Sequence, residues 1–127
     1  MLGFSKSGWG AWSLLLRHPE RFGKAAAWDA PLMMDGPGKY GSGAIFGTKE
    51  NFAKYRITTL LADRADRIRS GKRLLLLGAG NFQPEHEQAH ALLKRLKIDH
   101  DYTDGPVRKH DWHSGWVKDA VERLLAE

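Results

Sequence analysis

The sequence contains no cysteine, which excludes disulfide bonds, a thiolate nucleophile and a cysteine metal site. It has no apolar run near the roughly 20 residues that cross a bilayer, and no signal-peptide pattern opens the chain. We therefore expect no membrane association. A chain without cysteine also fits a reducing compartment, so the expected location is the cytoplasm.

A concentrated basic stripe is lacking as well. The formal net charge is +5, but the lysines and arginines are scattered along the 127 residues. Such scatter is typical of solvated helix faces, so we expect no nucleic-acid partner. The length and the 42% hydrophobic composition predict a single domain, residues 1–127, with one core.

What the chain does contain is an alternation of short apolar segments and amphipathic ones. Four consecutive leucines at 74–77 predict a buried central strand, and residues 24–29 and 98–103 predict two more. Residues 31–47, with two prolines and five glycines, predict a long irregular loop. Helical apolar spacing predicts helices from about Trp9 to Pro19 and over residues 48–55, 57–68, 84–96 and 116–125. Strands that alternate with helices predict an α/β fold with a mostly parallel sheet.

The first residues carry the clearest chemical signal. Gly3 and Gly8 bracket Ser5, and an apolar helical stripe follows at once. A serine among small residues at a sharp strand-to-helix turn is typical of a nucleophile elbow, where the helix N-terminus supplies N–H groups for an oxyanion. The alternative is a flexible Gly/Ser-rich terminus without a role in chemistry.

Three stretches, GFSKSGWGAWSLLLRHPERFG, LLLLGAGNF and GPVRKHDWHSGW, resemble the C-terminal half of an α/β-hydrolase of the esterase D and feruloyl-esterase type. The resemblance implies a partial α/β-hydrolase fold and a serine carboxylesterase that acts on small esters without a cofactor. By position, Ser5 resembles the nucleophile and His110 the general base. The backbone N–H of Lys6 corresponds to an oxyanion donor, and Trp112 is expected to line the substrate pocket.

The third member of the catalytic triad is where the chain departs from this family. Asn81 stands at the position of the family acid, and an amide holds an imidazole without stabilising its charge. Asp29, after the preceding predicted strand, is the alternative acid. Glu85 and Glu87 are weaker candidates further along the chain.

A second departure is that the resemblance begins only four residues before Ser5, as though the chain were truncated before the elbow. The family's second oxyanion donor precedes this point, and the sheet is expected to end in an exposed edge. We therefore expect a homo-oligomer that pairs through this edge. The alternative function is a catalytically impaired remnant of the hydrolase fold that self-associates or binds a partner.

Residues 86–90, His-Glu-Gln-Ala-His, match the H-E-x-x-H pattern of zinc hydrolases. A zinc hydrolase that uses His86 and His90 is therefore a third hypothesis. The competing interpretation is an amphipathic helix with half-buried histidines, because a proline-initiated helix follows the leucine strand directly. His113, near His110, is interpreted as a surface histidine.

Overall fold

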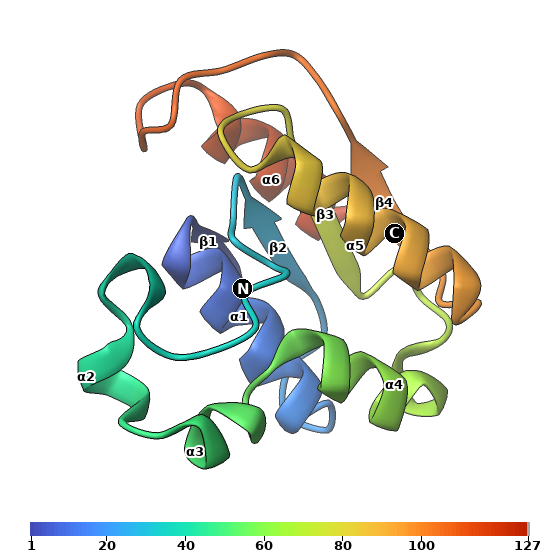
Figure 1. The fold of residues 1–127 in the computed structure, drawn as a ribbon. Coiled ribbons are helices and arrows are strands. Elements are labelled where there is room, and N and C mark those ends of the chain that lie inside the picture. The colour runs from blue at the N-terminus through green and yellow to red at the C-terminus, as the bar shows by residue number, and fades with distance from the viewer. Residues whose placement is uncertain (127) are drawn as a thin grey trace.

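The computed structural model describes residues 1–126, and its centre is a four-stranded parallel sheet (Figure 1). The strands lie side by side in chain order, with each neighbouring pair parallel. They are β1 (Leu2–Phe4), β2 (Ala25–Trp28), β3 (Leu74–Leu77) and β4 (His100–Thr103). The predicted α/β class and parallel sheet are therefore confirmed.

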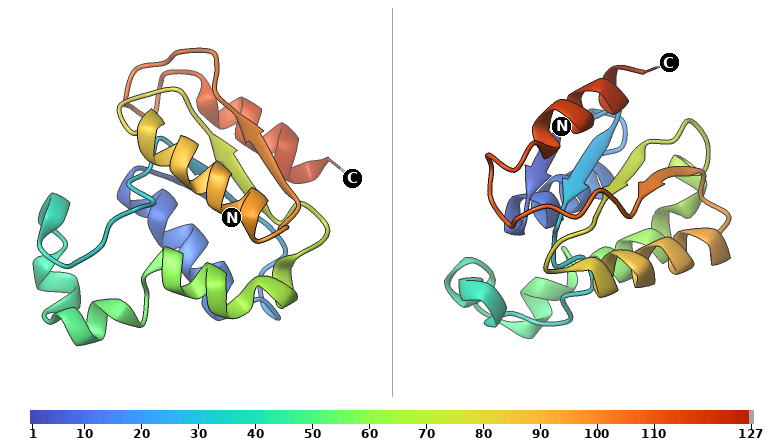
Figure 2. Two further views of the ribbon diagram at one scale, coloured as in Figure 1. Left: turned by 45° about the vertical axis from the view of Figure 1, so that its right-hand side comes forward. Right: turned by 90° about the horizontal axis from the view of Figure 1, so that it is seen from above.

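Helices cover the sheet on both faces, which gives the three layers seen from above in Figure 2. Helices α1 (Lys6–Arg17), α4 (Ile57–Ile68) and α5 (Gln83–Arg95) share one face, and α6 (Trp116–Leu125) lies on the other. Each of these helices matches a predicted apolar stripe to within a few residues.

Two cores result, because successive side chains of a strand point to opposite faces of the sheet. Ala27 and Leu76 belong to the larger core under α1, α4 and α5, whereas Trp28 and Leu77 belong to the smaller one under α6. Both central strands are buried along their whole length. Their uninterrupted apolar sequences are explained by this burial on both faces.

The predicted irregular loop at 31–47 contains short helical turns that its glycine and proline content did not indicate. These are η1 (Lys39–Gly41) and α2 (Gly43–Phe46), followed by α3 (Lys49–Ala53). Thr48 caps α3, since its hydroxyl accepts the Asn51 N–H at 3.1 Å. The segment projects from the sheet beside α1 (Figure 1).

All four strands end at the same edge of the sheet, because they are parallel. Ser5 follows β1, Asp29 follows β2 and Gly78 follows β3. The loop that contains His110 follows β4 and leads to α6. Within residues 1–126, no helix is both long enough and apolar enough to traverse a bilayer.

Candidate active site

The turn between β1 and α1 places Ser5 in a rare backbone conformation, with φ of 57° and ψ of −124°. Positive φ at a residue other than glycine costs of order 1–3 kcal/mol and needs support from its surroundings. That support includes the Ser5 N–H, which continues the β1–β2 ladder by donating to the Trp28 carbonyl at 3.0 Å. Gly3 permits the tight turn, since an added methyl group would overlap the Ser7 carbonyl. This is the backbone geometry of a nucleophile elbow.

Helix α1 begins at Lys6, immediately after Ser5. The Ser5 carbonyl accepts hydrogen bonds from the N–H groups of Gly8 and Trp9, at 3.0 and 3.2 Å. The Lys6 N–H belongs to the first turn, whose N–H groups have no acceptor inside the helix and carry its positive dipole end. It therefore lies where a negative oxygen beside Ser5 would be stabilised.

Asp29 is the carboxylate that meets His110. Its side chain is fully buried, and its Oδ2 lies 2.5 Å from His110 Nδ1. The backbone N–H groups of Asn81 and Phe82 also donate to this carboxylate, at 2.9 and 2.6 Å. Gly80 allows this close approach, because a side chain there would overlap the Asp29 carboxylate. The residue predicted as the alternative acid is thus in contact with His110, and Asn81 contributes its backbone N–H to the same carboxylate.

The contact fixes the orientation of the histidine ring. An ionised carboxylate only accepts hydrogen bonds, so His110 Nδ1 carries a proton and donates a hydrogen bond to Asp29. In the neutral form of the ring, Nε2 is then the nitrogen with a free lone pair. A base held in this tautomer is the arrangement that a serine nucleophile requires.

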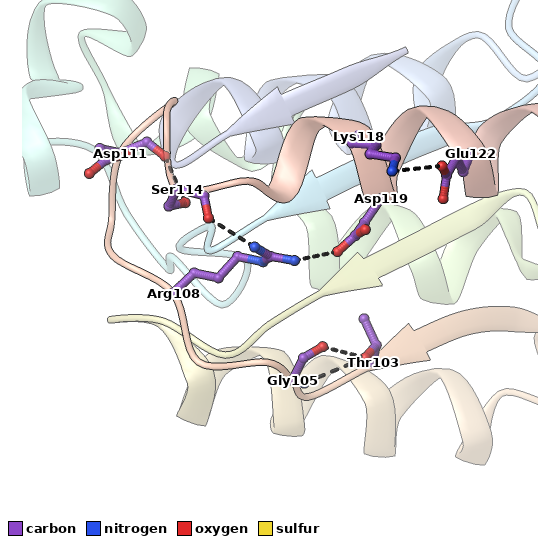
Figure 3. A network of polar contacts seen from close by, with 8 residues as sticks. All are labelled: Thr103, Gly105, Arg108, Asp111, Ser114, Lys118, Asp119 and Glu122. Carbon is purple, nitrogen blue, oxygen red and sulfur yellow. Dashed lines mark hydrogen bonds and ion pairs between the residues drawn. The ribbon is translucent and has the colours of Figure 1, made fainter.

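Arg108 anchors the loop between β4 and α6, which contains His110. Figure 3 shows its guanidinium between Ser114 and Asp119. Its guanidinium donates to the Ser114 carbonyl at 2.9 Å and to Asp119 Oδ2 on α6 at 2.6 Å. Its backbone N–H donates to the Ala79 carbonyl at 3.1 Å, which ties the loop to the segment after β3. No sequence pattern indicated Arg108, because its position in the chain does not show that its guanidinium reaches the far end of the loop and α6.

Aromatic rings surround the His110 side chain. The Phe4 ring centroid is 4.5 Å from that of His110, and the Phe82 centroid is 5.7 Å from it. Trp112 is 48% exposed and packs edge-on against Phe4 at 5.3 Å. Trp112 therefore lies near the candidate site, while Phe4 and Phe82, which no sequence pattern indicated, contact the histidine itself.

The other candidate acids are bound elsewhere. Glu85 Oε1 accepts the Met33 N–H at 2.9 Å, and burial raises the pKa of the Glu85 carboxyl despite that bond. Glu87 lies on α5 as well, and its Oε1 accepts a hydrogen bond of 3.4 Å from the Gln83 amide in the preceding turn. His113 has its backbone N–H bonded to an Asp111 carboxylate oxygen in the surface loop. None of these contacts involves His110.

The two histidines of the H-E-x-x-H pattern point to different partners. His86 is fully buried, and its Nε2 accepts the Ala30 N–H at 2.9 Å. Burial lowers the pKa of His86 to about 4, and the nearby Asp29 opposes this shift only in part. His90 stacks on Tyr102, with ring centroids 3.9 Å apart. Its Nδ1 contacts a ring nitrogen of His100 at 2.8 Å.

The positions of His86 and His90 therefore do not match those of two ligands to one metal ion. Across residues 1–126, no three histidine, aspartate or glutamate side chains are grouped so that they could hold a metal ion. The competing interpretation, an amphipathic helix with half-buried histidines, is correct for His90 and wrong for His86, which is fully buried.

Comparison with solved structures gives the fold. The chain superposes on S-formylglutathione hydrolase (FrmB) from Staphylococcus aureus with a TM-score of 0.69 and 18% sequence identity. It superposes on a ferulic acid esterase with a TM-score of 0.66 and 18% identity. Each match covers 97% of this chain. The chain has a partial α/β-hydrolase fold.

The match extends over only part of the two solved structures. The chain spans about half the length of each, 47% of the hydrolase and 48% of the esterase. Neither a protein-family model nor a curated protein matches the sequence. The sequence resemblance to esterase-type α/β-hydrolases is thus confirmed for the fold, and the chemistry has to be argued from the site.

Proposed function

We propose that this chain is a serine carboxylesterase that acts on small esters through an acyl-enzyme. The observation that carries the proposal is the contact between the buried Asp29 and the partly exposed His110, at the sheet edge where the Ser5 turn also lies. The Phe4 ring, from the residue before Ser5, is in contact with the His110 ring. Structural neighbours named as hydrolase and esterase support the same class of reaction.

The reaction begins when His110 Nε2 takes the proton from the Ser5 hydroxyl. Ser5 Oγ attacks the ester carbonyl, and the Lys6 N–H stabilises the oxyanion that forms. The imidazolium returns the proton to the leaving alcohol, and an acyl-enzyme remains. His110 then takes a proton from a water molecule, whose oxygen attacks the acyl carbon. The imidazolium gives this proton to Ser5 Oγ as the bond between Ser5 Oγ and the acyl carbon breaks, which releases the acid and restores both Ser5 and the neutral His110. Asp29 stabilises the imidazolium in both half-reactions without becoming protonated.

A labelling experiment tests the proposal. Diisopropyl fluorophosphate is expected to add one phosphoryl group to wild-type protein and none to Ser5→Ala, as seen by intact-mass spectrometry. Turnover of p-nitrophenyl acetate is expected to fall to background in the same variant. Ser13→Ala is the matched control, since Ser13 lies within α1, is buried, and donates its hydroxyl to the Tyr55 carbonyl. If the wild-type protein is not labelled and Ser5→Ala leaves turnover unchanged, the proposal is wrong.

The alternative, an impaired remnant that binds a partner, is favoured by one feature of the oxyanion site. Residues 1–126 supply the Lys6 N–H beside Ser5, whereas the fold usually adds a second donor from another strand's loop. Loss of one donor costs about 10²–10³-fold in kcat. If diisopropyl fluorophosphate labels Ser5 while kcat is lower by this factor, the chain is an impaired enzyme.

The proposal includes self-association through the free edge of β1. Met1 and Ser5 bond to β2, so the groups of Leu2 and Phe4 face outward by alternation. At Phe4 the outward N–H and C=O are both occupied by the Ser7 hydroxyl, at 2.8 and 2.7 Å. The available edge is therefore shorter than the strand itself and centres on Leu2.

Leu2→Pro tests this edge directly. It removes the outward N–H of Leu2 and leaves the bonds of Met1 and Ser5 to β2 in place, and proline is tolerated on edge strands. Multi-angle light scattering is expected to show an oligomer for wild-type protein and a monomer for the variant. A wild-type monomer at high concentration would end this part of the proposal.

A further inference from the structure

An apolar cavity of about 190 Å³ opens beside the first turns of α1. One wall comes from α1 and the other from the segment that contains η1 and α2. The residues that line it are Lys6, Trp9, Gly10, Met34, Ser42, Ile45 and Phe46. Lys6, which directly follows Ser5 in the chain, is part of this lining, so the cavity wall includes the neighbour of the proposed nucleophile.

Lys6 is the only charged residue among those that line the cavity. Its Nζ reaches across to the opposite wall and lies 3.6 Å from the point where a side chain on Gly41 would begin. The Ser42 hydroxyl donates to the Lys39 carbonyl at 2.7 Å, so this polar group of the lining is already used. The cavity is thus a short apolar space with one ammonium group at its side.

From this arrangement we propose that the cavity binds the acyl chain of the ester and that the Lys6 ammonium binds a carboxylate at the chain's far end. The inference rests on the proposed esterase function and specifies its substrate class: monoesters of short dicarboxylic acids. At about 30 Å³ per small group, the cavity holds roughly six non-hydrogen atoms. A four-methylene chain with its terminal carboxylate at Lys6 is near this limit.

Two 4-nitrophenyl esters of nearly equal shape test the charge. One is the monoester of adipic acid and the other is the ester of 6-methylheptanoic acid, each corrected for hydrolysis without protein. The measured quantity is the ratio of kcat/KM for the anionic ester to that for the neutral ester. Lys6→Met is expected to lower this ratio about tenfold, the lower end for a charge-assisted hydrogen bond. Because the ratio compares two substrates on one variant, any change at the Lys6 backbone N–H cancels.

Lys49→Met is the matched control, since it removes the same charge from an exposed position on α3. It is expected to leave the ratio unchanged within twofold. An equal fall in both variants would assign the effect to net charge and overturn the role of Lys6.

Gly10→Leu tests the cavity independently of charge. A side chain at Gly10 meets no atom within 4 Å, so leucine fits on α1 and extends into open space at the cavity wall. Leucine also favours helix over glycine, so the variant is expected to fold. For wild-type protein, kcat/KM should rise up to about fourfold per methylene from the acetyl to the hexanoyl ester. Gly10→Leu should abolish most of this rise, while Gly10→Ala should retain it.

The outcomes separate the two proposals. Hydrolysis of neutral esters without dependence on chain length or on Lys6 would overturn the substrate class and leave the esterase standing. Absence of any Ser5-dependent hydrolysis would overturn the esterase. Binding of adipate to Ser5→Ala, followed by isothermal titration calorimetry and weakened about tenfold by Lys6→Met, would still support the cavity in that case.

Discussion

Replacement of Asp29 by asparagine is expected to damage both the proposed catalysis and the fold. The carboxylate accepts three hydrogen bonds: one from His110 and two from the N–H groups of Asn81 and Phe82. An asparagine amide offers one oxygen and one NH₂ group to the same three donors. In either orientation, its NH₂ group faces a donor, so at least one charge-assisted bond is lost in a fully buried position.

The magnitude follows from those contacts. Loss of one such bond costs about 1.5–3 kcal/mol of unfolding free energy. For a domain of this size that corresponds to a fall in Tm of roughly 5–15 °C. If the amide NH₂ group turns toward His110, it forces the ring into the wrong tautomer. The equivalent exchange in a Ser-His-Asp triad lowers kcat about 10⁴-fold.

Calorimetry for Tm and p-nitrophenyl acetate turnover for kcat check the two effects together. Asn81→Asp is the discriminating control, because Asn81 is exposed and only its backbone N–H contacts Asp29. A new surface charge there should change kcat by less than about fivefold. Should Asp29→Asn keep its rate and Tm while Asn81→Asp gains tenfold in kcat, the assignment of Asp29 is refuted.

Three further predictions concern groups around the site. His86 is neutral in the folded chain, with a pKa of about 4. In the unfolded chain, His86 takes up a proton as the pH falls below about 6.5, whereas in the folded chain it stays neutral. The free energy of unfolding should therefore drop by about 2 kcal/mol between pH 7.5 and 5.0. Urea unfolding of His86→Gln should lack that part of the pH dependence, and an unchanged slope would contradict it. Arg108→Met should lower kcat roughly 10–100-fold with little change in KM, because the His110 loop loses its anchor on α6; an unchanged kcat in steady-state assays would show that the loop holds without it. Ser7→Ala should free the outward backbone groups of Phe4 and shift light-scattering masses toward larger oligomers, whereas an unchanged mass distribution would show that Ser7 does not limit pairing.

Much of the fold was predictable because it depends on local patterns. The leucine run at 74–77 is apolar on every residue, as burial on both faces requires, and β3 occupies those residues. The short apolar segment before Asp29 could be helix or strand by composition, but its position in the chain favoured a strand. β2 forms there. The short helices within 31–47 were not predictable, because Phe46 of α2 packs against Trp9 of α1 and Phe52 of α3, contacts that apolar spacing within the segment does not encode.

The partner of His110 shows why the site was harder to predict than the fold. Family position pointed to Asn81, and the chain offered Asp29 only as an alternative. The choice depends on backbone details that sequence spacing does not encode. Asp29 adopts a positive φ of 44° after β2, and Gly80 leaves room for its carboxylate between two backbone N–H groups. Residues 52 or more apart in the chain build this contact, so no local pattern contains it.

Lys6 extends the same reasoning from the catalytic groups to the substrate. Sequence alone gave Lys6 a role through its backbone N–H, which any residue after a nucleophile supplies, and so its side chain carried no information. The proposed role of the Lys6 side chain depends on the folded structure, in which the segment with η1 and α2 lies beside α1 and forms an apolar cavity that Lys6 helps to line. The loop that sequence described least well is therefore the part of the chain that is expected to select the substrate. Variation in residues 31–47 should change acyl preference while leaving the Asp29–His110 contact intact, because no residue of that segment bonds to either side chain among the hydrogen bonds described for residues 1–126.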